Sequence, residues 1–252
     1  MDKTAVKLLR LFEHLCRAET PLGVSALAAR MHLTKSNAHR ILRTLTGLGY
    51  VQQTDNGQYC PTLKAWELGT LVMGRLDFVQ IAKPYLKELN VSTGESVYLA
   101  TLNGTDVVYL DVLESRYPIR INAAIGGSAP SHCSASGKLL LAYNPLIAEQ
   151  YLVKPLEKFT PRTVTRLSEV QQKLEAIRRA GYSINDEEWV EGVCGVAAPV
   201  HDGRRQGIAA IGITALKETV NRAKMKQLIT QVSDVAQRVS VQLGYRAPAR
   251  HG

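Results

Sequence analysis

The chain has 252 residues, enough for one large domain or two ordinary ones, and its 45% hydrophobic and 21% charged residues are typical of a folded globular protein. Lysine and arginine number 31 against 22 acids, and this net charge of +9 favours a polyanionic partner without proving one. The four cysteines form no CxxC pair, which excludes a zinc finger and argues against a disulfide framework. No apolar stretch reaches the roughly 20 residues that cross a bilayer, and the N-terminus lacks the apolar core of a signal peptide. We therefore expect no membrane contact and a cytoplasmic location.

The positive charge is concentrated near the N-terminus. Residues 1–76 hold ten basic and five acidic residues, and no acid occurs between Glu19 and Asp55. The basic residues and histidines inside that interval are Arg30, His32, Lys35, His39, Arg40 and Arg43. Charge alone is equally consistent with a solvated helix face and with a surface that binds phosphates.

The local pattern decides in favour of DNA. Apolar residues at intervals of three and four predict an amphipathic helix over 3–18. A second, short helix capped by Ser25 and a third capped by Thr34 are expected to follow. Asn56 and Gly57 suit a two-residue hairpin turn, which predicts a wing. The order indicates a winged helix-turn-helix, in which the third helix enters the major groove.

This third helix has an apolar and a polar face. The apolar residues are Ala38, Ile41, Leu42, Leu45 and Leu48. On the other face, Asn37 and Arg40 can make bidentate contacts with adenine and guanine, while neighbouring residues can bind the DNA backbone and so position the protein. The candidates for contact with double-stranded operator DNA are Ser25, Lys35, Ser36, Asn37, His39, Arg40, Arg43, Thr44, Gln52 and Gln53. Each alone is explained equally well as an exposed polar residue, but the combination favours DNA binding.

A linker helix is expected next. We expect a DNA-binding domain over 1–61, the linker over 62–76 and a second domain over 77–252. The linker carries apolar residues such as Trp66 and Leu71 nearly all round, so it needs cover on several sides. Either it is a buried connector within one chain, or it packs against the same helix of a second chain. Because a winged helix commonly needs a second half-site, we expect at least a dimer.

The second domain is predicted to be α+β, a mainly antiparallel sheet flanked by helices. Strands are expected over 95–102, 106–113, 119–124, 182–189, 193–201 and 208–216, and helices over 77–91, 133–143, 168–180 and 220–243.

This domain offers no convincing catalytic set. The spacing of Gly127 and Gly137 departs from the phosphate-loop pattern, and no ordered triad can be named. The acidic run from Asp186 to Glu191 is more simply a solvated edge than a metal site. The small residues around Ser134 predict the start of a helix, whose free amides suit a carboxylate. Simple capping by Ser134 explains the same residues equally well. We expect no enzyme, cofactor or metal; the alternatives are a small-molecule enzyme with an accessory domain and a structural DNA binder without ligand.

Four ordered segments together resemble the isocitrate lyase regulator (IclR) family of bacterial transcription factors. They are PLGVSALAARMHLTKSNAHRILRTLTGLGYV, YCPTLKAWELG, GGSAPSHCSASGKLLLA and GYSINDEEWVEGVCGVAAPV. The resemblance implies a winged helix, a linker helix and a GAF-like effector domain, in dimers or tetramers. It also implies that a small organic acid controls binding to a palindromic operator of a catabolic operon, as a repressor or an activator.

The resemblance places the effector between the start of the SASGK helix and the sheet. The matching positions are Ile121, Ala129, Ala135, Ser136, Asn185, Cys194, Gly195, Gly212 and Thr214. Cys194 stands one place before the family's cysteine and should face the other side of its strand. Because Gly195, Gly212 and Ala129 stand where other members have polar groups, we expect a roomier cavity and an aromatic or sugar-derived carboxylate.

Overall fold

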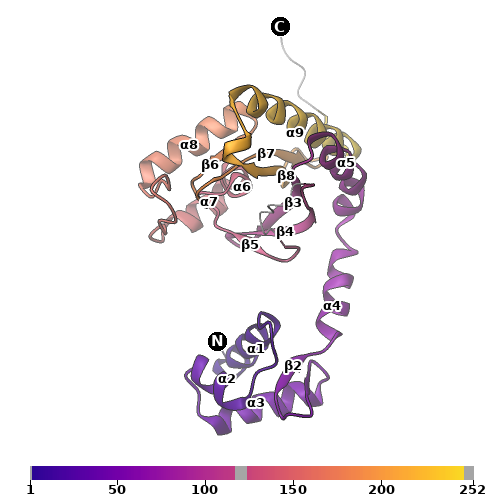
Figure 1. Cartoon of the computed structure of the whole chain (residues 1–252), viewed down its shortest axis with the longest axis vertical. Helices are drawn as coiled ribbons and strands as arrows, with labels where there is room; N and C mark the ends of the chain where they lie inside the picture. The colour runs from indigo at the N-terminus through magenta and orange to yellow at the C-terminus, as the bar shows by residue number, and fades with distance from the viewer. Residues whose placement is uncertain (1, 117–123, 247–252) are drawn as a thin grey trace. The chain divides into compact units, whose positions relative to one another are not determined.

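The computed structural model describes residues 2–116 and 124–246, and the chain divides into two compact units, residues 1–76 and 77–252 (Figure 1). Each unit has its own buried apolar core. No helix within the described ranges is long and apolar enough to cross a membrane.

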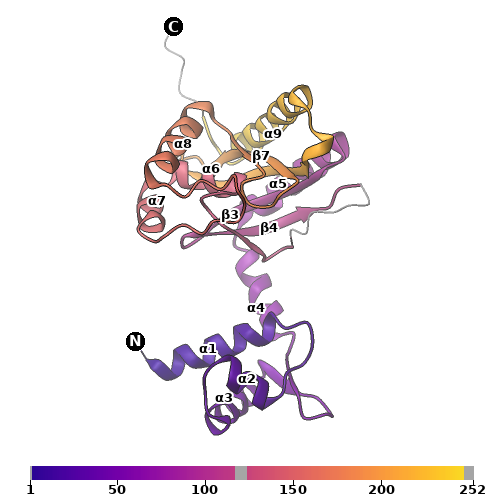
Figure 2. The ribbon, with the colours of Figure 1, turned by 60° about the vertical axis from the view of Figure 1, so that its left-hand side comes forward.

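In unit 1, the first three helices pack together beside a two-stranded antiparallel hairpin, and a fourth helix follows (Figure 2). Its elements are α1 (Lys3–Cys16), α2 (Val24–Arg30), α3 (Lys35–Gly47), β1 (Val51–Gln53), β2 (Tyr59–Pro61) and α4 (Lys64–Met73). Apolar residues spaced by three or four along the helices meet in one cluster, to which each strand adds one residue. The cluster comprises Leu11, Leu15, Leu27, Ala28, Ala38, Ile41, Leu42, Leu45, Val51 and Tyr59. The arrangement is the winged helix-turn-helix that the sequence predicts.

Two of the expected helix caps have different outcomes. Thr34 caps α3 as predicted, because its Oγ1 accepts a hydrogen bond from the Asn37 amide at 3.3 Å. The predicted cap of α2 is wrong: Gly23 takes the cap position, and Ser25 lies exposed inside the first turn without a capping bond. Leu48, expected on the apolar face of α3, instead follows the helix and is 54% exposed.

The hairpin turn is longer than predicted. The Thr54 amide donates to the Gln58 carbonyl at 2.8 Å, which leaves a three-residue loop between the strands. Gly57 has a φ of 73°, whereas Asn56 does not have a positive φ, so the two-residue turn with two such residues is wrong. The geometry is that of a three-residue loop closed by one left-handed glycine.

Helix α4 exposes its apolar residues. None of its residues is buried, and Trp66, Leu71 and Val72 are 68%, 65% and 60% exposed. Leu63, which precedes the helix, is 75% exposed. Within unit 1, these apolar side chains therefore have no cover.

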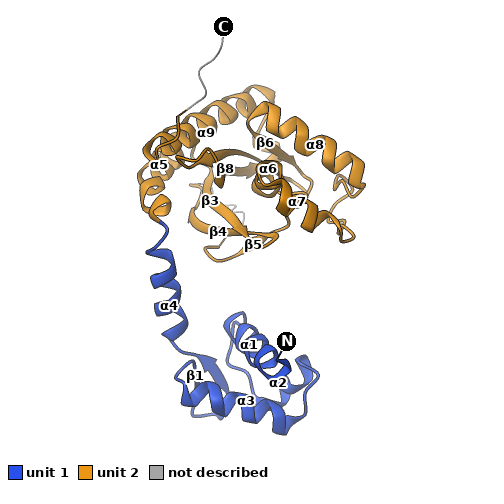
Figure 3. Ribbon diagram, turned by 180° about the vertical axis from the view of Figure 1, so that it is seen from behind, with its two compact units in different colours: residues 1–76 blue, residues 77–252 orange. Residues whose placement is uncertain are grey.

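Unit 2 is built on a six-stranded antiparallel sheet in the order β5-β4-β3-β8-β7-β6 (Figure 3). Its elements are α5 (Asp77–Thr93), β3 (Ser96–Asn103), β4 (Asp106–Leu113), β5 (Ser128–Ala129), α6 (Ala135–Tyr143), α7 (Pro145–Leu152), α8 (Leu167–Ala180), β6 (Ser183–Asp186), β7 (Val193–His201), β8 (Gly207–Leu216), the 3-10 helix η1 (Lys217–Thr219) and α9 (Arg222–Gln242). Helices α5 and α9 cover one face of the sheet, and α6, backed by α7 and α8, covers the other. The predicted α+β class is confirmed.

Several elements of unit 2 differ in detail from the prediction. The sequence did not indicate β5 or α7, and the strand expected over 182–189 ends at Asp186. Of the strand expected over 119–124, only Ala124 lies among the described residues, and there it is not part of a strand. Helix α8 ends as predicted at Gly181, whose φ of 77° suits a residue without a side chain.

Candidate DNA-binding surface and effector site

The outward face of α3 is basic and largely free of internal partners. Lys35, Arg40 and Arg43 are exposed, and no carboxylate of the described residues forms an ion pair with any of them. Ser36 and His39 share this exposure, whereas Asn37, at the capped end, and its neighbours on the inner side are more covered. Because these charged groups break no internal ion pair when they bind phosphates, the face suits a polyanion.

Three of the sequence-based DNA contacts already have partners within the chain. The Thr44 hydroxyl donates to the Arg40 carbonyl at 3.1 Å, one turn earlier in α3. In the wing, Gln53 Nε2 donates to the Gly57 carbonyl at 3.1 Å, and Gln52 Nε2 lies 3.5 Å from Cys60 Sγ. Each of these groups would exchange an internal hydrogen bond for one to DNA, which reduces its net contribution.

The start of α4 is tied to the end of α3, a contact that sequence reasoning missed. Lys64 Nζ donates to the Leu48 carbonyl at 2.7 Å and lies 4.6 Å from the centre of the Tyr50 ring. The Thr62 hydroxyl donates to the Gly49 carbonyl at 2.6 Å. A cation at the carbonyl end of a helix is favourable. The absence of a basic residue from the last turn of α3 was the available signal that a donor comes from elsewhere.

The expected effector site begins at the amino end of α6. Ser134 caps this helix, because its hydroxyl accepts from the Gly137 amide at 3.1 Å and donates to the Pro130 carbonyl at 2.7 Å. A side chain at Gly137 would come within 2.4 Å of Ser131 Cα, so glycine permits the loop to lie against the helix. The capping interpretation of Ser134 is therefore correct, and Ala135 and Ser136 follow it fully buried.

The space over Gly212 is occupied by another residue of the chain. Tyr98 pairs with Gly212 across β3 and β8, and a Cβ at Gly212 would lie 2.3 Å from the Tyr98 hydroxyl oxygen. A Cβ at Gly195 would lie 2.7 Å from the Ile213 carbonyl of the adjacent strand. The expectation that these glycines leave a roomier cavity is wrong, because one space holds an aromatic ring and the other holds backbone.

Two tyrosines surround the Ser136 hydroxyl. The rings of Tyr98 and Tyr109 meet edge to face with centroids 5.1 Å apart. Burial raises the pKa of both phenols, that of Tyr109 to about 12, and the nearby Ser136 partly opposes this rise. Ser136 Oγ itself is buried and has no hydrogen-bond partner of good geometry among the described residues. Thr214 lies near the Tyr98 hydroxyl and likewise partly opposes the rise in its pKa.

The remaining candidates lie in different surroundings. Ala129 and Ala135 belong to the same buried cluster as the two tyrosines. Asn185 lies directly across from Gly195, but its Oδ1 accepts from the Glu188 amide at 2.9 Å and so faces its own loop. Cys194 alternates to the opposite face of the strand, where burial raises its pKa to about 11. Ile121 lies outside the described residues.

The acidic run near β6 is not simply a solvated edge. Glu188 is 6% exposed and forms an ion pair with Lys138 of α6, which is 2% exposed. Lys173 of α8 binds the other carboxylate oxygen at 3.1 Å, and the Ile184 carbonyl accepts from Lys138 at 2.7 Å. Burial lowers the pKa of Lys138, and the Glu188 carboxylate opposes that shift. The pair fixes α6 against β6 and α8, and no group of three metal-binding side chains occurs in the described ranges.

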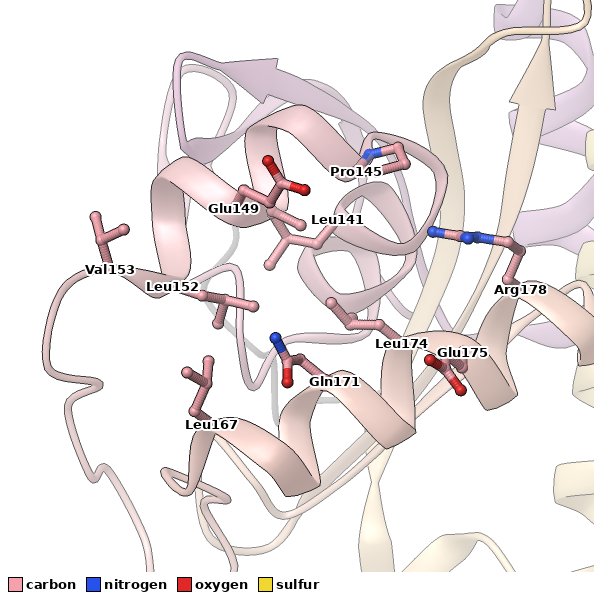
Figure 4. A pocket seen from close by; sticks show the side chains of 11 residues that line it. Leu141, Pro145, Glu149, Leu152, Val153, Leu167, Gln171, Leu174, Glu175 and Arg178 are labelled. Carbon is pink, nitrogen blue, oxygen red and sulfur yellow. The ribbon is translucent and has the colours of Figure 1, made fainter.

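Two cavities of unit 2 lie away from these residues. The larger, of about 610 Å³, is a groove between α7 and α8 near the carboxyl end of α6 (Figure 4). Figure 4 shows Leu141, Leu152 and Leu174 on its walls. The smaller, of about 280 Å³, lies beside His132, whose two ring nitrogens bond to the Tyr151 hydroxyl and the Glu157 carbonyl. Neither cavity is lined by a candidate effector residue.

Family comparisons identify the chain. Residues 4–55 match the IclR helix-turn-helix domain, and residues 70–241 match the bacterial transcriptional regulator IclR C-terminal domain. The chain belongs to the IclR family. Its members include the glycerol operon regulatory protein of Streptomyces coelicolor, which is 35% identical to this IclR chain over 243 residues, 95% of this chain and 94% of that protein. The chain is thus a DNA-binding transcriptional regulator, as its relatives are named, and not an enzyme.

Solved IclR structures share the fold over nearly the whole length. The Thermotoga maritima IclR crystal structure has a TM-score of 0.77 and 27% identity, covering 96% of this chain and 99% of that one. An IclR homologue from Microbacterium hydrocarbonoxydans, crystallised with 4-hydroxybenzoate, has a TM-score of 0.84 and 24% identity, with coverage of 96% and 99%.

Proposed function

We propose that this IclR-family regulator binds a palindromic operator through α3 and that an organic acid bound at the start of α6 changes that binding. The observation that carries the first part is the exposed, acid-free face of α3, where Lys35, Arg40 and Arg43 have no ion-pair partner among the described residues. Arg40 would contact a base and Lys35 a phosphate. The other candidates would bind the DNA backbone and so position the protein on the duplex. The regulator would work in the bacterial cytoplasm, on nucleoid DNA, at a catabolic operon.

The proposed effector is an aromatic or sugar-derived carboxylate. The amino end of α6 favours an anion, because helix amides and the helix dipole point towards it. The buried Ser136 hydroxyl supplies a further donor. A relative of the same fold was crystallised with 4-hydroxybenzoate, an aromatic acid. The space for a ring is not supplied by the glycines, since Tyr98 covers Gly212.

A thermal-shift and calorimetric screen tests this effector class. We expect the full chain to be stabilised by at least one aromatic or sugar-derived acid, since a ligand that binds the folded state at 100 times its Kd adds about 2.7 kcal/mol of stability. The screen includes glyoxylate and pyruvate as small acids of the same charge. Binding only of these two- and three-carbon acids would contradict the proposed class.

We further propose that the regulator is a dimer or tetramer held in part through α4. The apolar side chains of this helix, including Trp66 and Leu71, have no cover within unit 1, and exposed apolar groups of this size favour association. Two half-sites one DNA turn apart would then be read together.

Charged substitutions in α4 test the oligomer. Light scattering after size exclusion is expected to give at least a dimer for the unaltered chain at micromolar concentration. We expect the double variant Trp66→Lys and Leu71→Lys to dissociate, because each lysine would be desolvated in the interface. Leu146→Lys, on the exposed surface of α7, is the control and should leave the mass unchanged. An unaltered chain that is only monomeric would refute the proposal.

A further inference from the structure

The Tyr98 side chain covers the sheet and also reaches the amino end of α6. Its ring fills the space above Gly212, and only 3% of the residue is exposed. Its hydroxyl end lies near the amino end of α6, next to the amide and hydroxyl of Ser136 and the hydroxyl of Thr214. The phenol therefore stands between the sheet and α6, at the place where the proposed function puts the acidic group of an effector.

The amino end of α6 is not fully satisfied by its own residues. Ser134 caps the helix through the amide of Gly137. Ser136 Oγ is completely buried, and although the Tyr98 and Tyr109 phenols lie near it, it forms no hydrogen bond of good geometry with any described residue. A buried hydroxyl without a partner is unfavourable, so an acceptor that bonds to it would gain more than at a satisfied position.

A neutral phenol interacts only weakly with the amino end of a helix. Burial raises the pKa of Tyr98, so the group stays uncharged near neutral pH. A carboxylate at a helix amino end interacts with the helix dipole and forms charge-assisted hydrogen bonds, which are stronger than those of a neutral hydroxyl. Replacing the phenol by an acid of suitable shape would thus strengthen the interactions at the amino end of α6.

We propose that Tyr98 is an internal occupant of the effector site, so that an acid binds by displacing its ring and hydroxyl, and Tyr98 thereby sets which acids enter. The proposal rests on the proposed effector site and adds the residue that determines its specificity. The simpler alternative is that Tyr98 only covers a cross-strand glycine, as aromatic residues do in sheets. The two interpretations predict different ligands for the space that remains once the Tyr98 side chain is removed.

The experiment uses Tyr98→Ala in the full chain, without DNA. This variant leaves a space about the size of a phenol, and benzoate differs from neutral phenol in carrying a carboxylate where phenol carries its hydroxyl. We expect calorimetry at pH 7 to show benzoate binding about tenfold more tightly than phenol, because its carboxylate meets the amino end of α6. Adding Ser136→Ala should reduce this preference. Phenol binding as tightly as benzoate, or no benzoate binding, would overturn the proposal, because a purely structural hole disfavours a buried charge.

Tyr98→Phe covers the case in which the alanine variant does not fold. It keeps the ring and removes only the hydroxyl, so 4-hydroxybenzoate should displace it more easily and bind several-fold more tightly than to the unaltered chain. Tyr143→Phe, a half-buried tyrosine against Gly207 at the other end of α6, is the matched control and should bind the acid as the unaltered chain does. Equal binding to the Tyr98→Phe and Tyr143→Phe variants would refute the displacement. Failure of the proposed function is a separate result, namely that no acid changes operator binding by the unaltered chain.

Discussion

Replacing Glu188 by alanine is expected to destabilise unit 2 by about 3 to 5 kcal/mol, the usual cost of removing one partner of a buried ion pair. The Lys138 ammonium, 2% exposed in the unaltered chain, would keep only the Ile184 carbonyl as a hydrogen-bond partner among the described residues. Its options would be to lose its proton or to move into solvent, and moving would disrupt α6. Because the proposed effector site begins at the amino end of α6, we expect weakened acid binding as well. Urea unfolding followed by circular dichroism measures the loss of stability.

Two controls separate the buried charge from general effects of substitution. Glu169→Ala, in the first turn of α8, removes an exposed ion pair with Arg166, which precedes the helix, and should cost less than about 1 kcal/mol. The double variant Lys138→Met and Glu188→Leu removes both charges and should recover most of the stability, since apolar replacement of a buried pair is often neutral. A loss below about 1 kcal/mol in Glu188→Ala alone would show that the pair does not hold α6 in place.

Replacing Arg40 by alanine is expected to weaken binding to the operator by about 1 to 3 kcal/mol, the typical contribution of an arginine that reads a guanine. Arg40 is exposed on α3, and no described carboxylate competes for its guanidinium. The operator fragment for this test is the one that the full chain enriches from a random DNA pool. Fluorescence anisotropy compares affinity for it with that for a scrambled fragment, and we expect Arg40→Ala to lose affinity only for the operator.

Lys35 provides the matched comparison on the same helix. If it meets a phosphate, Lys35→Ala should weaken binding to operator and scrambled DNA alike and reduce the slope of log affinity against log salt by about one. Unchanged operator binding by Arg40→Ala would remove Arg40 from the interface. A Lys35 variant that loses affinity only for the operator would reverse the assigned roles.

Local chemistry explains what the sequence predicted correctly. Thr34 caps α3 because a hydroxyl before a helix bonds to an amide three residues on, a contact that depends on neighbours alone. The same holds for Gly181 at the end of α8. Alternation along strands likewise placed Cys194 on the face opposite Gly195. The wing was predicted, but Asn56 was given a role in a two-residue turn that Gly57 fills alone in a longer one.

The errors at the candidate effector site come from contacts between distant residues. Glu188 lies in a run of acids that looks solvated, and only the fold brings it to Lys138, fifty residues earlier. Gly212 suggested empty space because a glycine has no side chain, yet the register of β3 against β8 places Tyr98 over it. Neither partner can be read from spacing, so the sequence misjudged how the space around these candidate residues is filled.

In the proposed function, one ligand site in unit 2 controls DNA binding by unit 1. The direct test is an anisotropy titration of the full chain onto its selected operator at fixed salt, with and without the acid found by the screen. We predict operator binding at least about 1,000-fold tighter than binding to scrambled DNA, and a change in that affinity of about 5- to 150-fold on adding the acid. Equal affinity for operator and scrambled DNA, or an operator affinity that no bound acid alters, would contradict the proposed regulation.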